Sequence, residues 1–406
     1  MYTLRFCLKS FFLLFLFSCQ SQVDLVKNND EVITIELQEE PYITIGAERL
    51  GEYLPKLKGK RIGIVANQTS MVKNVHLVDT LLISGIKVVS VFSPEHGFRG
   101  DADAGEKVLS GKDTKTGLPL VSLYGKNKKP TPEQFANLDV IIFDIQDVGA
   151  RFYTYISTLH YVMEAAAENG KKVVVLDRPN PNGHYVDGPV LKPGFTSFVG
   201  MHPIPIVHGM TIAEYAMMIN GEGWLNNGVS CDLEVVLCER YNREMKYELP
   251  IPPSPNLRTQ ASILLYPSLC LFEGTIMSEG RGTDFPFEIF GHPQLPDSIY
   301  SFSFTPVSGF GSKYPKLENK LCHGLKLTTE AATIDALNID WLIDAYNNYP
   351  GEDFFITKNR WFDILAGGSS LREQIIQGKS AYEIRASWQT ELNEFREVRA
   401  KYLLYE

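Results

Sequence analysis

A carboxylate, an imidazole and a guanidinium lie close together in residues 93–100, whose sequence is Ser-Pro-Glu-His-Gly-Phe-Arg-Gly. The segment follows the apolar run 88–92, which is rich in β-branched residues and is typical of a strand. Pro94 and the glycines would end that strand and allow a sharp turn. Because ligands of open α/β sheets bind beyond the carboxyl ends of strands, Glu95 and His96 stand where an acid or a base could act.

Other polar side chains lie at further expected strand ends and loops. Residues 144–151 follow an apolar run, but an aspartate at a strand end often caps the next helix, so a structural role and a substrate role are both open there. Residues 272–284 carry three acids and an arginine among small residues, a density that favours a ligand-facing loop. The candidates from these two segments are Asp144, Asp147, Arg151, Glu273, Glu279 and Arg281.

Loop carboxylates with neighbouring arginines suit the hydrolysis of a glycosidic bond. That reaction needs one acid to protonate the leaving oxygen and commonly a second carboxylate as nucleophile or base, although an N-acetylated sugar can supply its own nucleophile. Arginine forks would hold a carboxylate on the sugar, and aromatic rings could stack on it, with core packing as the default interpretation of each ring. The aromatic candidates are Phe98, Tyr124, Tyr153, Tyr155 and Phe285.

The elements that must position these residues form an alternating pattern. Apolar runs that predict strands fall at 61–66, 87–92, 118–124, 139–145 and 172–176, and helical patterns fall at 76–84 and 153–169. This alternation predicts an α/β fold with a doubly wound, mostly parallel sheet. No Gly-x-Gly-x-x-Gly turn follows the first run, so we expect no dinucleotide cofactor.

Proline- and glycine-rich connections then predict a second unit of the α+β class. We expect the first unit to cover 42–194 and the second to cover 195–406, with a cleft between them. The elements expected in the second unit are a helix opened by the capping box Thr211–Glu214, a strand at 232–237, and helices at 340–347 and 387–402.

The first 18 residues have the pattern of an export signal. Two cationic residues precede the apolar run 11–17, which is too short to span a membrane comfortably. The run ends in Leu-Phe-Ser-Cys, which resembles a bacterial lipobox with Cys19 as the lipidated first mature residue; an ordinary secretory signal or an uncleaved anchor is the alternative. Residues 19–41 are polar and predict a flexible tether. We therefore expect a lipid-anchored protein of the bacterial cell envelope, on the periplasmic side or at the outer membrane.

Composition and spacing argue against other partners. The formal net charge is −9 and no long basic run is present, so nucleic acid is not an expected partner. No Cys-x-x-Cys pair occurs, and His96, His202 and His208 are not at metal-ligand spacing, so we expect neither a metal nor a cofactor. A metal-assisted hydrolase that uses His96, Asp101 and Asp103 stays open as an alternative, and sensitivity to chelators would identify it.

Six ordered motifs together resemble the exo-β-N-acetylmuramidase family, bacterial peptidoglycan hydrolases long catalogued as a domain of unknown function. The motifs are 63–69, 92–100, 144–151, 177–181, 253–256 and 272–283. The resemblance runs from about residue 45 to the C-terminus. It implies a Rossmann-like domain with an auxiliary C-terminal domain, an active site in the cleft between them, and release of terminal N-acetylmuramic acid from the non-reducing end of cell-wall fragments.

This resemblance makes Glu95 the leading catalytic carboxylate. Our hypothesis is that Glu95 is the general acid, with Glu279 or Asp144 as its partner, and that Arg281 or Arg151 holds the lactyl carboxylate of muramic acid. Around the sugar the resemblance implies Asn67, His96, Arg99, Asp144, Asp147, Arg151, Glu273, Glu279 and Arg281. The alternative from another class is a lipoprotein that binds cell-wall sugars without cleaving them, and binding without a new reducing end would support it.

Overall fold

A seven-stranded sheet organises the first half of the computed structural model, which describes residues 42–99 and 110–406. The strand order is β5-β6-β4-β1-β7-β8-β9, and every neighbouring pair is parallel except β5 with β6 at one edge. The strands are β1 (Arg61–Ala66), β4 (Lys87–Ser93), β5 (Gly111–Lys112), β6 (Pro119–Ser122), β7 (Val140–Asp144), β8 (Lys172–Leu176) and β9 (Asp232–Val236). The predicted doubly wound, Rossmann-like α/β fold is confirmed.

Both faces of this sheet are covered by helices, which explains the continuous apolar runs of its strands. On one face Ile62 and Ile64 of β1 pack in a buried cluster with α1 (Leu50–Leu57) and α2 (Leu77–Ile83). Val65 points to the other face, where the buried cluster includes residues of α4 and α5. These helices are α4 (Tyr155–Glu168) and α5 (Ile212–Gly221). The helices predicted at 76–84 and 153–169 are thus α2 and α4.

The main sheet extends past the boundary that we expected between residues 194 and 195. The predicted strand at 232–237 forms β9, and β9 pairs in parallel with β8 of the main sheet. Helix α5 does begin with the predicted capping box, in which the Glu214 carboxylate accepts from the Thr211 N–H at 2.9 Å, but it contacts α4, β8 and β9. Assigning this helix and strand to the second unit is therefore wrong, because local periodicity does not say which sheet a strand joins.

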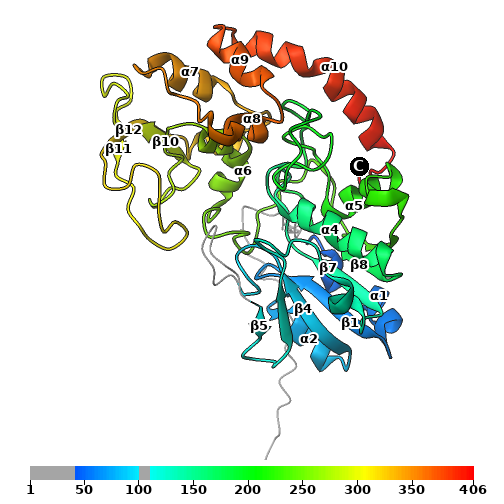
Figure 1. Cartoon of the computed structure of the whole chain (residues 1–406). Helices are drawn as coiled ribbons and strands as arrows, with labels where there is room; N and C mark the ends of the chain where they lie inside the picture. The colour runs from blue at the N-terminus through cyan, green and yellow to red at the C-terminus, as the bar shows by residue number, and fades with distance from the viewer. Residues whose placement is uncertain (1–41, 100–109) are drawn as a thin grey trace, which may run out of the picture. The chain divides into compact units, whose positions relative to one another are not determined.

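The rest of the chain combines helices with a small antiparallel sheet (Figure 1). Its strand order is β10-β12-β11, with β10 (Ile289–His292), β11 (Phe302–Phe304) and β12 (Cys322–Lys326). The helices are α6 (Gln260–Leu269), α7 (Asp340–Asn348), α8 (Trp361–Ala366), α9 (Ser370–Ile376) and α10 (Ala381–Ala400). Helix α10 begins before the predicted residue 387, because Ser380 and Glu383 form a capping box there.

The remaining elements are short. They are the hairpin β2 (Met71–Val72) and β3 (Val75–His76), helix α3 (Pro132–Phe135), and the 3-10 helices η1 (Gly46–Glu48), η2 (Asn226–Gly228), η3 (Cys270–Gly274), η4 (Glu330–Thr333) and η5 (Lys358–Arg360). Within 42–99 and 110–406, no helix is long and apolar enough to cross a bilayer. The expected signal, tether and Cys19 lie outside the described residues.

One apolar core links the sheet to the C-terminal helices. The buried cluster on the α4 and α5 face continues through Leu269, Phe287 and Phe355 to Leu392 of α10, with each of these side chains less than a tenth exposed. Residues 43–406 accordingly form one compact unit. Side chains from both halves therefore have fixed positions around any cavity that lies within this unit.

Candidate active site

A tight turn follows β4 at the carboxyl edge of the main sheet. The Gly97 N–H donates to the Pro94 carbonyl at 3.2 Å, which closes the turn around Glu95 and His96. His96 has φ +71°, a left-handed conformation that residues other than glycine seldom adopt. Such strain persists where the surrounding structure holds it and is common at functional sites. The turn presents the half-buried Glu95 to a cavity beyond the sheet.

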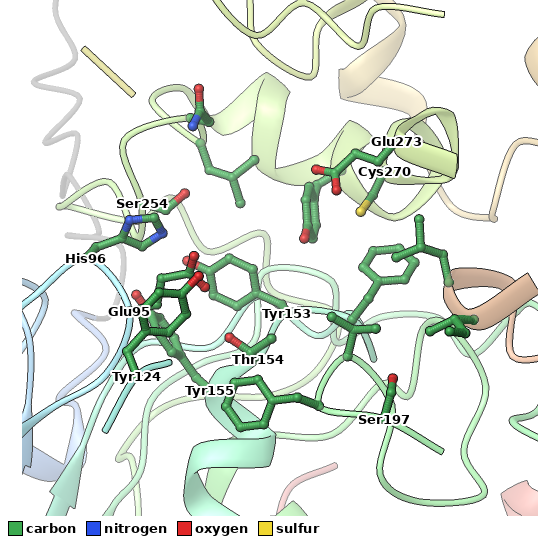
Figure 2. A pocket seen from close by; sticks show the side chains of 18 of the residues that line it. Glu95, His96, Tyr124, Tyr153, Thr154, Tyr155, Ser197, Ser254, Cys270 and Glu273 are labelled. Carbon is green, nitrogen blue, oxygen red and sulfur yellow. The ribbon is translucent and has the colours of Figure 1, made fainter. Parts of the chain in front are cut away.

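That cavity has a volume of about 960 Å³, near the upper end of the range of about 300–1,000 Å³ that is usual for small-molecule sites. Glu95 and His96 contribute from the end of β4, Tyr124 comes from the end of β6, and Tyr153 and Tyr155 come from the start of α4 (Figure 2). These strand ends are the expected place for a ligand on an open parallel sheet.

The second half of the chain supplies the facing wall of the cavity. This wall includes Ser254, Asn256, Leu257, Tyr266, Cys270, Glu273, Arg281, Phe287, Trp361, Ile364 and Leu365. Figure 2 shows Glu273 and Cys270 across the cavity from Glu95 and Tyr124. Among the described lining residues, only Glu95 and Glu273 carry a carboxylate, and the two therefore face one cavity from different parts of the fold.

Glu95 is surrounded by tyrosines. Burial raises the pKa of Tyr124, and the charge of the Glu95 carboxylate and its hydrogen bond with the Tyr124 hydroxyl raise it further. Burial also raises the pKa of Tyr155, whose hydroxyl accepts from the Asn67 side-chain amide at 3.0 Å and donates to the Pro253 carbonyl at 3.1 Å. Asn67 thus positions Tyr155 but does not itself line the cavity. The hydroxyls of Tyr124 and Tyr155 stay protonated near neutral pH.

Glu273 forms an ion pair with Arg281 on the opposite wall. The Arg281 Nη2 atom lies 2.7 Å from a Glu273 oxygen, and Nε lies 3.4 Å from Glu279. Burial alone would lower the pKa of Arg281, but the two carboxylates raise it, so its guanidinium stays charged. Glu279 is only 2% exposed and also pairs with Lys316 at 2.7 Å. Glu279 therefore lies behind Arg281, outside the lining of the cavity.

Asp144 forms a buried ion pair away from the cavity lining. Its two oxygens accept from Arg178 at 2.6 and 3.0 Å, and its side chain has no exposed surface. Asp147, also buried, accepts from the Gly149 N–H at 2.7 Å and lies 3.7 Å from His208. Burial raises the pKa values of Tyr153 and Tyr155, which line the cavity, and the charge of Asp147 raises them further. Asp144 thus pairs with Arg178, and neither Asp144 nor Asp147 lines the cavity.

Two of the candidate arginines also lie outside the lining. Arg151 is fully buried and donates to the carbonyls of Pro189, Ile204 and Leu365 at 2.7–2.9 Å. Burial without a carboxylate partner lowers the pKa of Arg151 to about 9. Arg99 pairs with Asp113 at 3.0 Å and lines a separate depression. Arg151 therefore supports the wall at Leu365, and Arg281 is the candidate arginine that reaches the cavity.

Sequence reasoning identified part of the lining and missed the rest. Of the aromatic candidates, Tyr124, Tyr153 and Tyr155 line the cavity, while Phe98 and Phe285 do not. The missed residues include Lys126, Lys128, Phe198, Tyr266, Phe287 and Trp361. The two lysines follow β6, so the rule that pointed to Glu95 at the end of β4 could have found them. The aromatic residues of the second half carry no local signal that distinguishes them from core residues.

The chain is similar to known proteins over most of its length. Residues 62–261 match the family model for the N-terminal part of exo-β-N-acetylmuramidase NamZ, and residues 264–405 match the model for its C-terminal part. The peptidoglycan β-N-acetylmuramidase NamZ of Bacillus subtilis is 42% identical over 387 residues, which cover 90% of this chain and 92% of that protein.

Two crystal structures of DUF1343 family proteins from Bacteroides fragilis have the same fold. One is 48% identical with a TM-score of 0.83 and the other is 32% identical with a TM-score of 0.77; each comparison covers 90% of this chain and 99% of the other. The protein is thus an enzyme of the glycoside hydrolase class. More narrowly, the chain belongs to the exo-β-N-acetylmuramidase NamZ family, both of whose family models it matches.

Proposed function

We propose that this enzyme removes N-acetylmuramic acid from the non-reducing end of peptidoglycan fragments, with Glu95 as the general acid. The Bacillus subtilis relative, a peptidoglycan β-N-acetylmuramidase, supports the substrate class. The observation that carries the assignment to Glu95 is its position at the end of β4, in the cavity, beside Tyr124 and across from Glu273. A carboxyl group there can deliver a proton to the glycosidic oxygen of a bound sugar.

The second carboxylate of the site is Glu273 in this proposal, in place of Glu279 or Asp144. Glu279 is held by Arg281 and Lys316, and Asp144 is held by Arg178. Both of these carboxylates lie outside the lining, whereas Glu273 lines the cavity. Glu273 would act on the face of the sugar opposite Glu95, either on an attacking water or on the N-acetyl group as it becomes the nucleophile.

Arg281 would recognise the lactyl carboxylate that distinguishes muramic acid from glucosamine. Its guanidinium lines the cavity and is charged, and it is fixed by Glu273 and by the Phe287 ring, whose centroid lies 4.9 Å from the guanidinium carbon. A guanidinium held in this way can donate to a carboxylate with defined geometry. Lys126 and Lys128 add positive charge to the same cavity, which would favour an anionic sugar.

The test of this function is product analysis with a disaccharide that has N-acetylmuramic acid at its non-reducing end. We expect the purified protein to release free N-acetylmuramic acid and a new reducing end, with the same rate after treatment with a chelator. Intact disaccharide together with measurable binding would instead support a sugar-binding protein. Loss of the activity on chelation, with recovery on adding a divalent metal, would support the metal-assisted alternative, whose Asp101 and Asp103 lie outside the described residues.

We also propose that the protein is anchored to the cell envelope through a lipid on Cys19. The support is the sequence Leu-Phe-Ser-Cys after a short apolar run that follows cationic residues. Fractionation of cells that produce the full chain would test it. We expect the wild type in the membrane fraction and Cys19→Ala outside it, and an unchanged distribution of Cys19→Ala would contradict the anchor.

A further inference from the structure

A second depression adjoins the cavity in the C-terminal half of the protein. It has a volume of about 600 Å³ and is lined by polar and aromatic side chains. We call it the Phe310 groove; its main residues are Arg258, Asp284, Phe285, Phe302, Val307 and Phe310. Phe310 is 64% exposed and Val307 is 50% exposed, so the groove presents apolar surface to solvent.

The chain passes directly from the cavity into the groove at two points. Leu257 lines the cavity and Arg258 lines the groove, and in the same way Arg281 lines the cavity and Gly282 lines the groove. The first crossing lies on the side of the proposed acid, because Ser254 stands beside His96 in Figure 2, four residues before Arg258 in the sequence. The two depressions are therefore neighbours. The crossing at Leu257 and Arg258 lies near the proposed acid, and the crossing at Arg281 and Gly282 lies on the facing wall.

The segment that carries Phe310 is fixed to the rim of the cavity. Gly309 and Ser312 exchange two backbone hydrogen bonds of 3.0 and 3.1 Å, which close a tight loop around Phe310. The Arg258 guanidinium donates to the Phe310 carbonyl at 2.8 Å, and the Asn256 side-chain amide donates to the Gly311 carbonyl at 2.5 Å. An exposed aromatic ring on a loop held in this way is pre-organised for a ligand, because little further ordering is needed on binding.

We propose that the Phe310 groove binds the sugars that follow the terminal residue in a longer glycan, an inference that rests on the proposed function. In an exo-acting enzyme the leaving part of the chain must emerge past the general acid, and one of the two crossings into the groove lies on the side of that acid. The apolar faces of pyranose rings suit contact with Phe302 and Phe310. Cationic groups of Arg258 and Lys326, whose Nζ lies 3.6 Å from the Phe285 ring centroid, suit lactyl carboxylates further along the glycan.

This inference can be tested separately from the proposed function by measuring saccharide binding to Glu95→Gln, a variant that is expected to cleave its substrate slowly. In Glu95→Gln, the affinity for a muramic-acid-terminated tetrasaccharide is compared with the affinity for N-acetylmuramic acid by calorimetry, with and without Phe310→Ala. We expect Phe310→Ala to weaken tetrasaccharide binding about fivefold, or ~1 kcal/mol, and to leave the monosaccharide unchanged. Phe310→Trp should restore the affinity. Tyr382→Ala, at an 83% exposed aromatic residue of α10, is the matched control and should change neither.

Three other outcomes of the Phe310→Ala experiment would overturn the inference. Equal affinities of the Phe310→Ala and parent proteins for the tetrasaccharide would show that the groove holds no sugar, and equal weakening for both ligands would place the effect in the cavity. A shift of the protein from dimer to monomer by Phe310→Ala, without an effect on saccharide binding, would make the groove a contact between copies. Absence of turnover in the wild type would contradict the proposed function alone, because the binding comparison does not depend on cleavage.

Discussion

Arg281 and Glu273 are joined by an ion pair of 2.7 Å within the wall of the cavity. The pair supplies a charged guanidinium with a fixed orientation, and Glu279 supports it from behind at 3.4 Å. This arrangement brings one guanidinium and two carboxyl groups together in a partly buried place, where each has a partner of opposite type beside it. It also gives the two acids of the motif 272–283 different positions, because Glu273 lines the cavity and Glu279 does not.

Replacing Arg281 by lysine should weaken recognition of muramic acid. Lysine keeps the charge but loses the fork that donates to a carboxylate, so we expect KM for a chromogenic N-acetylmuramide to rise about tenfold, within the range of charge-assisted hydrogen bonds. Steady-state kinetics measures this effect. The matched control is Arg372→Lys, which changes an equivalent fork on Asp363 outside the cavity. An unchanged KM for Arg281→Lys would remove Arg281 from substrate recognition.

Replacing Asp144 by asparagine should affect stability far more than turnover. The change leaves the buried Arg178 guanidinium without its partner, so we expect a loss of about 3–5 kcal/mol in the free energy of unfolding. Urea unfolding measures that loss, and kcat of the folded protein at 25 °C should be close to that of the wild type. Asp139→Asn breaks the half-exposed pair with Arg61 and should cost far less stability, because solvent screens that pair. A stable Asp144→Asn protein with abolished turnover would return Asp144 to the mechanism.

A buried histidine pair should make the fold sensitive to mild acid. His202 lies 3.0 Å from His160, and burial lowers the pKa values of both imidazoles. Below about pH 6.5 the unfolded chain therefore takes up protons that the folded protein excludes. As the pH is lowered, the free energy of unfolding decreases by up to ~1.4 kcal/mol per pH unit for each imidazole.

The comparison of His202→Gln with the wild type isolates this effect between pH 7.5 and 5. Burial raises the pKa of Asp177 to about 7, which gives stability a pH dependence of the opposite sign in both proteins, so only their difference is informative. We expect the loss of stability toward pH 5 to be smaller in His202→Gln. Identical pH dependence in the two proteins would show that this imidazole does not titrate on unfolding.

The location of Glu95 was predictable because its signals are local. A β-branched run, a proline and a glycine predict a strand followed by a turn. Ligands bind beyond the carboxyl ends of parallel strands, so this turn is an expected place for a functional residue. Asp144 also ends a β-branched run at the same edge of the sheet, but it forms a buried ion pair with Arg178, which lies 34 residues further on, at the end of the adjacent strand β8. Sequence patterns do not show which strand-end acids are neutralised by such distant partners.

The facing wall of the cavity was the least predictable part of the site. Its residues include Tyr266 from α6 and Trp361 from α8, which have the apolar character of core residues. Only the packing of the C-terminal helices onto the sheet decides which of them meet the cavity. Strand β9 was misassigned for a similar reason. The sequence of its five residues does not show which strand they pair with.

The role of Glu95 as general acid is tested most directly by the kinetics of Glu95→Gln on two substrates. A natural disaccharide has a poor leaving group and needs a proton, whereas an N-acetylmuramide of a good leaving group needs little protonation. We expect kcat for the disaccharide to fall by about 10²–10⁴-fold, the usual contribution of general acid catalysis, and kcat for the activated substrate to fall far less. Turnover near the wild-type value on both substrates would contradict the account.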